Sequence, residues 1–494
     1  MPNNNEKSGL PTVLENIVTT RRTHLEDIAK RIAHVDVDSL PRSTRSLYDN
    51  LHGATNAFIM ECKSSSPSLG LIREHYEPGA IARIYSRYAA GISVLCEPEK
   101  FGGDYDHLQT VAMSSHLPVL CKDFIVDEVQ IHAARYFGAD AILLMLSVLN
   151  DEQYTRLQDE AHRFGLDVLT EVISEEEVER AIRLGAKIFG VNHRNLHDLS
   201  IDLSRSKTLA ALLPDDAVVV SESGIRNNET VRALGGHSNA YLVGSQLTST
   251  PDIDKAAREL VYGHNKVCGL TTWSAAQAAR AAGAVYGGLV FEETSSRNVS
   301  RETAEDIIAH EPDLDYVAVS RRTEGWAELA DIEAVTALQL HAPYQGSIEA
   351  ELDFIHAVVQ EVKDAGITVA STKDEDLDFG AEQESGLQIW RAVSMTHADG
   401  PALAQALIED KAVDLVVLDS GDGGTGTSFD WTTVPQEVLG SALLAGGIAP
   451  QNLEEALKVG TLGVDLNSGL ETKKAVKDTG LIARAFDIIR HFHF

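Results

Sequence analysis

The sequence predicts an α/β protein made of two consecutive (β/α)8 TIM barrels, with an extra N-terminal helical segment. Three observations predict this fold. Short apolar, β-branched runs alternate with segments of helical period, these runs fall into two sets of eight, and 494 residues are too many for one ordinary core. Strands alternating with helices at this spacing are parallel, and eight such units can close a barrel. Because periodicity does not reveal closure, a doubly wound open sheet in each half is the alternative.

Residues 1–50 precede the first strand-like run and form the helical segment. Its apolar residues recur at helical spacing: Val13, Leu14, Ile17, Val18, Leu25, Ile28 and Ile32. We expect a helix packed over one end of the first barrel.

The first set of strands defines a domain that we assign to residues 1–260. Its members start 21 to 36 residues apart, which leaves room for a helix and two turns each time. They are AFIMECK (57–63), SVLCE (93–97), PVLCKD (118–123), AILLML (141–146), DVLTEV (167–172), IFGVNHR (188–194), VVVSES (218–223) and AYLVGS (240–245).

The second set defines a domain that we assign to residues 261–494, after a short junction near 258–264 that has no Pro- or Gly-rich linker. Its members are KVCGL (266–270), YGGLVF (286–291), YVAVS (316–320), ALQLH (337–341), IWRAVSM (389–395), LVVLDS (415–420), ALLAGG (442–447) and VDLNS (464–468). A ninth run, ITVAST (367–372), precedes the acidic stretch 373–386. We interpret this part as an excursion outside the barrel.

Composition excludes several classes of function. A formal net charge of -32 disfavours nucleic acid and anionic membrane surfaces as partners, whereas small phosphorylated ligands need only a local site. The four cysteines form neither a disulfide framework nor CxxC metal spacing, and no signal-peptide or membrane-spanning pattern is present. We therefore expect a cytoplasmic protein. We also expect a monomer without metal or cofactor.

Polar residues gather where the predicted strands of the first set end, which is where barrel enzymes place catalytic groups. They are Glu61, Lys63, Lys122, Glu171, Asn192, Arg194, Glu222 and Ser223. Strand alternation puts Glu61 and Lys63 on one face. Each residue alone is more simply a solvated rim residue, but in a closed barrel all of them meet at one mouth.

Small residues follow the last two strands of each set. SESGI (221–225) and VGSQL (243–247) do so in the first half, and AGGI (445–448) and LNSG (466–469) in the second. Glycine permits close backbone approach and helix starts offer N–H groups to an anion. These positions are the common phosphate cradle of such barrels. The sequence thus predicts two phosphorylated ligands.

The second mouth has a different polar set. Cys268, Arg297, His341 and Asp419 follow its strands. A free cysteine is usually a small core residue. At a strand end facing a carboxyl group, however, a thiolate suits proton transfer between one base and one acid. No Cys-His-Asn arrangement supports a protease.

These motifs resemble two known families. IMECKSSSPS, LCKDFIVD, LLMLSVL, LTEV, GVNHRNL, SESGI and LVGS are similar to indole-3-glycerol-phosphate synthases. KVCGLT, YGGLVF, SSRNVS, LQLH, LDSGDGGTGTSFDW, LLAGGI and GVDLNSGLE are similar to phosphoribosylanthranilate isomerases. The resemblance covers almost the whole chain after residue 50 and implies the bifunctional fusion of tryptophan biosynthesis, acting on small phosphorylated derivatives of anthranilate.

For the synthase, the resemblance implies a role for each strand-end residue. Lys122 is the general acid, Glu171 stabilises positive charge or accepts a proton, and Asn192 orients hydroxyl groups. Glu61 and Lys63 pair and assist dehydration, and Ser223 belongs to the same catalytic set. The residues implied at the substrate and phosphate are Ser66, Arg194, Gly224, Gly244 and Ser245.

For the isomerase, the resemblance makes Cys268 the base and Asp419 the acid of an Amadori rearrangement. Arg297 binds the anthranilate carboxylate and His341 lines the pocket. Gly424, Gly447, Asn467 and Ser468 hold the phosphate. The chain departs from the family patterns at Ser64, Leu69, Ser296 and Ala342, none of which is a principal catalytic position.

Two other functions fit parts of the pattern. A regulatory pair of barrels would keep the phosphate cradles but lose the acids and bases, and here both persist. A Schiff-base aldolase would use the two lysines of the first mouth, and borohydride trapping with a ketose phosphate would identify it.

Overall fold

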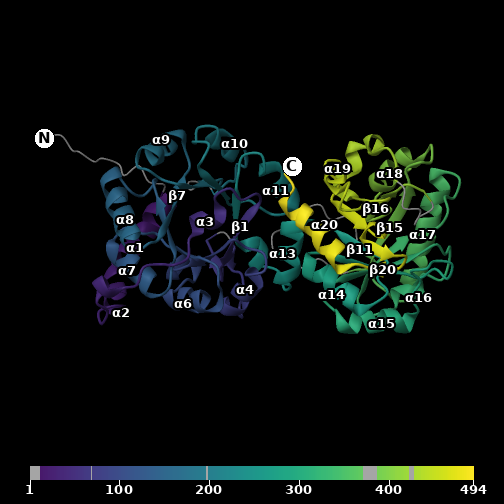
Figure 1. Ribbon diagram of the computed structural model, residues 1–494, viewed down its shortest axis with the longest axis horizontal. Helices are drawn as coiled ribbons and strands as arrows, with labels where there is room; N and C mark the ends of the chain where they lie inside the picture. Colours follow the sequence, from purple (N-terminus) through teal and green to yellow (C-terminus); the bar gives the residue numbers. More distant parts are fainter. Residues whose placement is uncertain (1–11, 68, 196–198, 371–385, 422–427, 494) are drawn as a thin grey trace. The chain divides into compact units, whose positions relative to one another are not determined.

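The computed structural model describes residues 12–67, 69–195, 199–370, 386–421 and 428–493. Within them the chain forms two closed barrels of eight parallel strands, which confirms the predicted fold (Figure 1). Two compact units divide between Ala257 and Arg258. Helix α13 (Ile253–Tyr262) runs across this point.

The first barrel closes when β1 pairs with both β4 and β10. Ile59 lies opposite Gly91 on one side and Leu242 on the other. Its strands are buried almost throughout because helices cover the outer face, which explains their continuous apolar runs. They are β1 (Ala57–Cys62), β4 (Gly91–Leu95), β5 (Val119–Lys122), β6 (Ala141–Met145), β7 (Asp167–Val172), β8 (Ile188–Asn192), β9 (Val218–Glu222) and β10 (Ala240–Val243). A small hairpin, β2 (Ser65–Ser66) with β3 (Gly70–Leu71), follows β1.

The helices between these strands begin at side-chain caps in most cases, such as Asp127 before α7 and Asn150 before α8. They are α4 (Pro78–Tyr85), α5 (Pro98–Phe101), α6 (Tyr105–Ser114), α7 (Glu128–Tyr136), α8 (Asp151–Arg163), α9 (Glu175–Arg183), α10 (Ser204–Ala210), α11 (Asn228–Leu234) and α12 (Ser245–Thr248).

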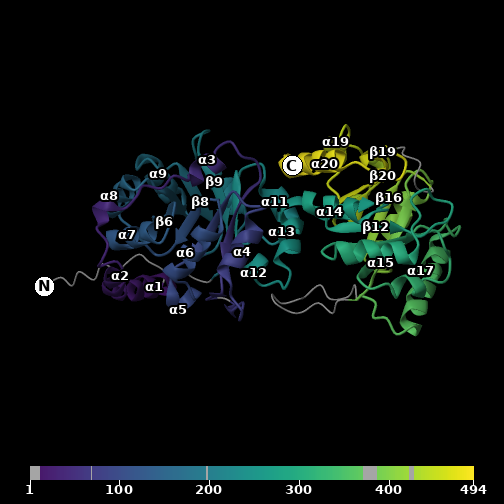
Figure 2. The same ribbon diagram turned by 60° about the horizontal axis from the view of Figure 1, so that its bottom comes forward.

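The N-terminal segment is helical as predicted, but α1 (Thr12–Thr23) and α2 (Leu25–Arg31) take the place of one continuous helix over the apolar pattern. These two helices are separated at His24, whose N–H bonds the carbonyl of Arg21 at 3.1 Å and so tightens the turn. The 3-10 helix η1 (Val37–Ser39) and α3 (Leu47–Leu51) follow. Figure 2 shows α1 and α2 beside each other at the start of the chain.

The second barrel closes through the pairing of β11 with β12 and β18. Its strands are β11 (Lys266–Cys268), β12 (Tyr286–Val290), β13 (Asp315–Ser320), β14 (Val335–Leu340), β15 (Gln388–Ser394), β16 (Leu415–Asp419), β17 (Ala442–Leu444) and β18 (Gly463–Leu466). Its helices are α14 (Trp273–Ala282), α15 (Arg301–His310), α16 (Ala327–Ala330), α17 (Ile348–Asp364), α18 (Gly400–Glu409), α19 (Leu453–Leu457) and α20 (Thr479–His491), with the 3-10 turns η2 (Trp431–Thr433), η3 (Gln436–Ser441) and η4 (Ser468–Leu470). The hairpin β19 (Glu471–Lys473) and β20 (Val476–Lys477) follows η4.

The described part of the ninth strand-like run, residues 367–370, lies outside the barrel, because β14 pairs directly with β15. Two backbone hydrogen bonds of 2.9 Å, from Ala370 N–H to the Leu387 carbonyl and from Leu387 N–H to the Thr368 carbonyl, hold the start and the end of this excursion together. Residues 373–385 of the acidic stretch lie outside the described residues. In the described parts of the chain, no helix is both long and apolar enough to span a membrane.

Candidate active sites

The first barrel has a cavity of about 170 Å³ at the C-terminal ends of its strands. Val13, Leu14 and Ile17 of α1 cover one side of it. The predicted site residues that line it are Glu61, Lys63, Ser66, Lys122, Glu171, Asn192, Arg194, Ser223 and Ser245. The N-terminal helix therefore forms part of this mouth.

A network of lysines and carboxylates from the ends of β1, β5 and β9 spans this cavity. Glu61 Oε1 lies 2.7 Å from Lys63 Nζ, and Glu61 Oε2 lies 3.4 Å from Lys122 Nζ. Lys122 Nζ also lies 3.0 Å from Glu222 Oε2. Burial alone would raise the pKa of Glu61, but the two lysines outweigh it and lower this pKa to about 2.

The same network keeps Lys122 charged. Burial disfavours its ammonium form, but the carboxylates of Glu222 and Glu61 outweigh this effect and raise the pKa of Lys122 above its ordinary value. A Schiff-base lysine needs a lowered pKa, because only the neutral amine is a nucleophile. This argues against Lys122 as the Schiff-base lysine of an aldolase.

A second chain of hydrogen bonds joins the ends of the neighbouring strands β7, β8 and β9. Ser223 Oγ donates to Asn192 Oδ1 at 3.0 Å, and Asn192 Nδ2 donates to Glu171 Oε1 at 3.1 Å. Burial and the nearby charge of Glu222 raise the pKa of Glu171 to about 8. One mouth thus holds a carboxylate with a low pKa and a carboxyl group with a high pKa, which is an arrangement that can divide acid and base roles.

Two glycines let the carboxylates approach the strands. A Cβ at Gly244 would lie 2.5 Å from Glu61 Oε1, and a Cβ at Gly190 would lie 2.2 Å from Glu222 Oε1. Gly244, predicted at the phosphate, is thus also required by the position of Glu61.

The predicted phosphate side of the first mouth is built from strand-to-helix turns. Ser223 and Gly224 have φ of 68° and 80°, a left-handed conformation that is unusual for serine. Ser245 begins α12 and its Oγ lies 3.5 Å from Lys63 Nζ. Arg194 donates to the Leu199 carbonyl at 3.2 Å.

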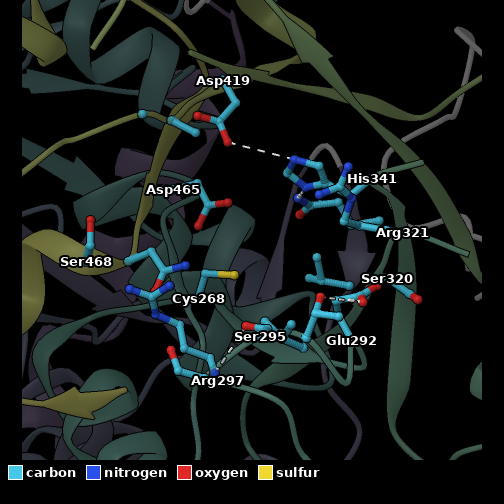
Figure 3. A pocket seen from close by; sticks show the side chains of 18 of the residues that line it. Cys268, Glu292, Ser295, Arg297, Ser320, Arg321, His341, Asp419, Asp465 and Ser468 are labelled. Carbon is cyan, nitrogen blue, oxygen red and sulfur yellow. Dashed lines mark hydrogen bonds and ion pairs between the residues drawn. The ribbon is translucent and has the colours of Figure 1, made fainter. Parts of the chain in front are cut away.

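The second barrel has a cavity of about 300 Å³ at the corresponding end (Figure 3). The predicted residues that line it are Cys268, Arg297, His341, Asp419, Gly447, Asn467 and Ser468. Gly424 lies outside the described residues. Gly446 and Gly447 have φ of 87° and 64°, so the turn after β17 uses two successive left-handed residues.

Asp419 and His341 face each other across this cavity (Figure 3), with Oδ2 and Nε2 3.9 Å apart. Burial and the nearby Arg391 lower the pKa of His341 to about 3, so this contact joins a neutral imidazole to the carboxyl group. Burial raises the pKa of Asp419, although the N–H of Ser420, 2.7 Å from its Oδ1, opposes the shift. The raised pKa suits a proton donor.

Cys268 ends β11 and is buried. Burial raises the pKa of its thiol, although the nearby Lys266 lowers it. The thiol form therefore dominates near neutral pH. A role as base uses the minor thiolate fraction, which is intrinsically a strong nucleophile and proton acceptor.

Arg297 lines the cavity but is already paired. Its Nε and Nη2 lie 2.7 and 2.9 Å from the two carboxylate oxygens of Glu471. Lys477 Nζ lies 2.8 Å from Glu471 Oε1 and 2.9 Å from Asn467 Oδ1. The hairpin after β18 thus fixes Arg297 and Asn467 at the rim.

Sequence reasoning missed several residues of these sites. The sequence places Glu222 at a strand end but indicates no role for it, although it contacts Lys122. Lys266 and Asp465 share a face with the site because of strand alternation, which a systematic count of inward positions would have found. Glu471 comes from a hairpin beyond the last strand, and no sequence signal marked it.

Comparisons with known proteins match two different families to the two halves of the chain. The family model of indole-3-glycerol phosphate synthase matches residues 14–260, and that of N-(5'phosphoribosyl)anthranilate isomerase matches residues 350–487. A crystal structure of phosphoribosyl anthranilate isomerase from Thermus thermophilus covers 45% of this chain and 96% of its own, with 26% identity and a TM-score of 0.35.

Two relatives match along almost their whole length. The tryptophan biosynthesis protein TrpCF of Corynebacterium glutamicum is 62% identical over 495 residues, which is 99% of each chain. The protein of the same name from Salmonella typhi is 43% identical over 452 residues, covering 91% of this chain and 92% of its own. The chain belongs to the family of bifunctional tryptophan-biosynthesis enzymes, in which an indole-3-glycerol phosphate synthase barrel precedes a phosphoribosylanthranilate isomerase barrel.

Proposed function

We propose that the mouths of the two barrels are the two active sites, within domains of residues 1–260 and 261–494. The second site would convert phosphoribosylanthranilate to 1-(2-carboxyphenylamino)-1-deoxyribulose 5-phosphate. The first would close that product to indole-3-glycerol phosphate, with loss of CO2 and water. Both substrates are small phosphorylated derivatives of anthranilate.

In the synthase reaction, the aromatic carbon that bears the carboxylate attacks the ketose carbonyl. Lys122, kept charged by Glu61 and Glu222, donates a proton to the carbonyl oxygen as the new bond forms. Glu171, on β7, lines the same cavity, where its ionised form stabilises the positive charge of the ring or accepts a proton during the loss of water.

The remaining residues of this mouth position the substrate. Asn192 and Ser223 orient its hydroxyl groups, and Lys63 contacts its carboxylate and assists dehydration together with Glu61. Ser66, Arg194, Gly224, Gly244 and Ser245 form the substrate and phosphate side.

In the isomerase reaction, Asp419 gives a proton to the ring oxygen as the furanose ring opens. Cys268 removes the proton from the adjacent carbon, and the resulting enamine becomes the ketone. Their positions on two separate strands, β16 and β11, that end at the same cavity support complementary proton transfers. Arg297 binds the anthranilate carboxylate, His341 lines the pocket as a neutral ring, and Gly447, Asn467 and Ser468 hold the phosphate, together with Gly424.

The contact of Lys122 with two buried carboxylates is the observation that carries the assignment of the first site. We expect Lys122→Ala to abolish indole-3-glycerol phosphate formation while isomerisation stays near normal, because Lys122 lies in the first barrel alone. Lys30→Ala, an exposed lysine of α2, is the matched control. Fluorescence assays for each step measure both variants. Ring closure at the wild-type rate by Lys122→Ala would refute the role.

We further propose that the protein acts in the cytoplasm as a monomer. Each cavity is lined by residues of a single barrel, so neither site needs a second chain. All four cysteines are buried free thiols, which suits a reducing compartment. Light scattering at micromolar concentration measures the oligomeric state, and a mass of two chains would contradict this proposal.

A further inference from the structure

One carboxylate oxygen of the second cavity has no hydrogen-bond partner among the described residues. Asp465, on β18, is only 8% exposed. Its Oδ2 accepts a hydrogen bond of 2.9 Å from Lys266 Nζ, whereas its Oδ1 is buried and receives none from the described residues. Figure 3 shows the carboxylate between Cys268 and Asp419, directed into the cavity.

A buried carboxylate oxygen without a hydrogen-bond partner is unusual in a folded protein. Nearly all buried polar atoms in folded proteins have a partner, and an unsatisfied charged group is costly. The ordinary explanation, a purely structural ion pair, accounts for Oδ2 alone. The other oxygen lines the cavity that we assign to the isomerase substrate.

The orientation of this carboxylate is fixed from behind. Lys266 is completely buried and its Nζ donates to both Asp465 and Gln339. Since the lysine is held by two partners on different strands, it holds Oδ2 in place and leaves Oδ1 facing the cavity. The pair therefore presents one fixed acceptor to whatever occupies the site.

The position along the strand indicates which donor fits. Asn467 and Ser468, at the proposed phosphate side, follow Asp465 by two and three residues. Cys268 and Asp419 flank it at the proposed reaction centre. A group between the phosphate and the reacting carbons of a phosphoribosyl compound is a sugar hydroxyl, which is a hydrogen-bond donor.

We propose that Asp465 Oδ1 accepts a hydrogen bond from one ribosyl hydroxyl of the isomerase substrate and so orients the sugar between Cys268 and Asp419. This inference rests on the proposed function of the second barrel. The bond involves an ionised acceptor, which makes it stronger and more directional than a bond between neutral groups.

The test uses the full-length protein and the reduced, non-reacting form of the product, a pentitol phosphate linked to anthranilate. Calorimetry compares this analogue with versions that each lack one hydroxyl group. We expect the wild-type protein to bind one deoxy version about tenfold or more weakly. Asp465→Asn should bind the complete analogue about tenfold more weakly than the wild-type protein does. Removing the same hydroxyl from the analogue should lower the affinity of this variant by less than about twofold.

A matched control is Asp414→Asn, because Asp414 precedes β16, away from the C-terminal strand ends, and accepts a hydrogen bond from Ile389 N–H. Asp414→Asn should show the same deoxy penalty as the wild-type protein, meaning the same loss of affinity when that hydroxyl is removed from the analogue. If Asp465→Asn does not fold, as judged by its thermal melt, the double variant Lys266→Met with Asp465→Asn leaves no unpaired buried charge and takes its place.

The possible outcomes separate two failures. If the deoxy penalty persists in the Asp465 variants, or if no hydroxyl matters to the wild-type protein, the assignment of Asp465 is overturned while the function of the barrel stands. If the wild-type protein binds no analogue at all, the proposed isomerase function itself fails.

Discussion

Arg21 of the N-terminal helix donates hydrogen bonds of 2.8 and 2.6 Å to the two carboxylate oxygens of Asp123, the residue that follows Lys122. Both side chains are almost completely buried. The hydroxyl of Tyr105 and the amide of Gln130 donate to the same carboxylate, so Asp123 is held from three sides. A residue outside the barrel thus fixes the end of the strand that carries the proposed acid.

We predict that Arg21→Gln weakens both stability and the synthase reaction. Removing one partner of a buried pair leaves a buried charge and costs about 3–5 kcal/mol. Thermal melts and separate assays of the two reactions measure the effect, and isomerisation should not change. The matched control is Arg31→Gln on α2, whose partners Asp104 and Asp106 are partly exposed. Such a surface pair contributes about 1 kcal/mol or less. Equal losses in both variants would contradict this prediction.

Glu171 should determine the pH dependence of ring closure. Its pKa of about 8 means that the ionised form, which is needed for charge stabilisation or proton acceptance, increases as the pH rises to that value. We expect kcat/KM of the synthase to rise with pH and level off above about 8. Glu171→Gln should lose nearly all activity and this rise. If kcat/KM of the synthase did not change between about pH 6 and about pH 9, this role of Glu171 would be excluded.

The same residue should lower the stability of the wild-type protein at high pH. The pKa of Glu171 in the folded state is above its ordinary value of 4.5, so its ionisation opposes folding increasingly as pH rises from 4.5 to about 8. Glu171→Gln removes this charge but keeps an acceptor for Asn192. The melting temperature of Glu171→Gln should match that of the wild-type protein near about pH 5. Near about pH 8.5 it should be higher, by roughly 2–4 °C for each kcal/mol that ionisation of Glu171 costs the folded wild-type protein. If the two melting temperatures differed by the same amount at both pH values, ionisation of Glu171 would not be what lowers the stability at high pH.

Gly190 tests the placement of Glu222. An added methyl group would meet Glu222 Oε1 at 2.2 Å and displace this carboxylate from Lys122. We predict that Gly190→Ala lowers the kcat of the synthase by about tenfold or more, as expected for a misplaced catalytic group. Gly236→Ala is the control, since a Cβ there has nothing within 4 Å. Unchanged kcat in Gly190→Ala would show that the position of Glu222 does not matter.

Cys268→Ser tests the division of labour between the barrels. Serine keeps the size of the side chain but is a much weaker base, so isomerisation should fall by about a hundredfold or more. Ring closure should stay at the wild-type rate. If ring closure failed instead, the proposal of two independent sites would be wrong.

Much of this architecture could be predicted because parallel strands covered on both faces are continuous apolar runs, and all sixteen barrel strands were anticipated on that basis. The pairing of Glu61 with Lys63 followed from alternation along a single strand. The contacts of Lys122 with Glu222, and of Arg297 with Glu471, join segments far apart in the chain, so no local pattern contained them. The break at His24 also escaped prediction, because the apolar spacing continues through it.

After α17, the excursion that precedes β15 begins and ends beside a backbone hydrogen bond from Ala370 N–H to the Leu387 carbonyl. The register of β14 and β15 is set by their own pairing, so it does not depend on how many residues lie between Ala370 and Leu387. Doubling the length of such a loop costs only about 0.6 kcal/mol of closure entropy. Chain inserted between Ala370 and Leu387 should therefore cost the barrel little stability, so this is the position at which we would insert a reporter peptide.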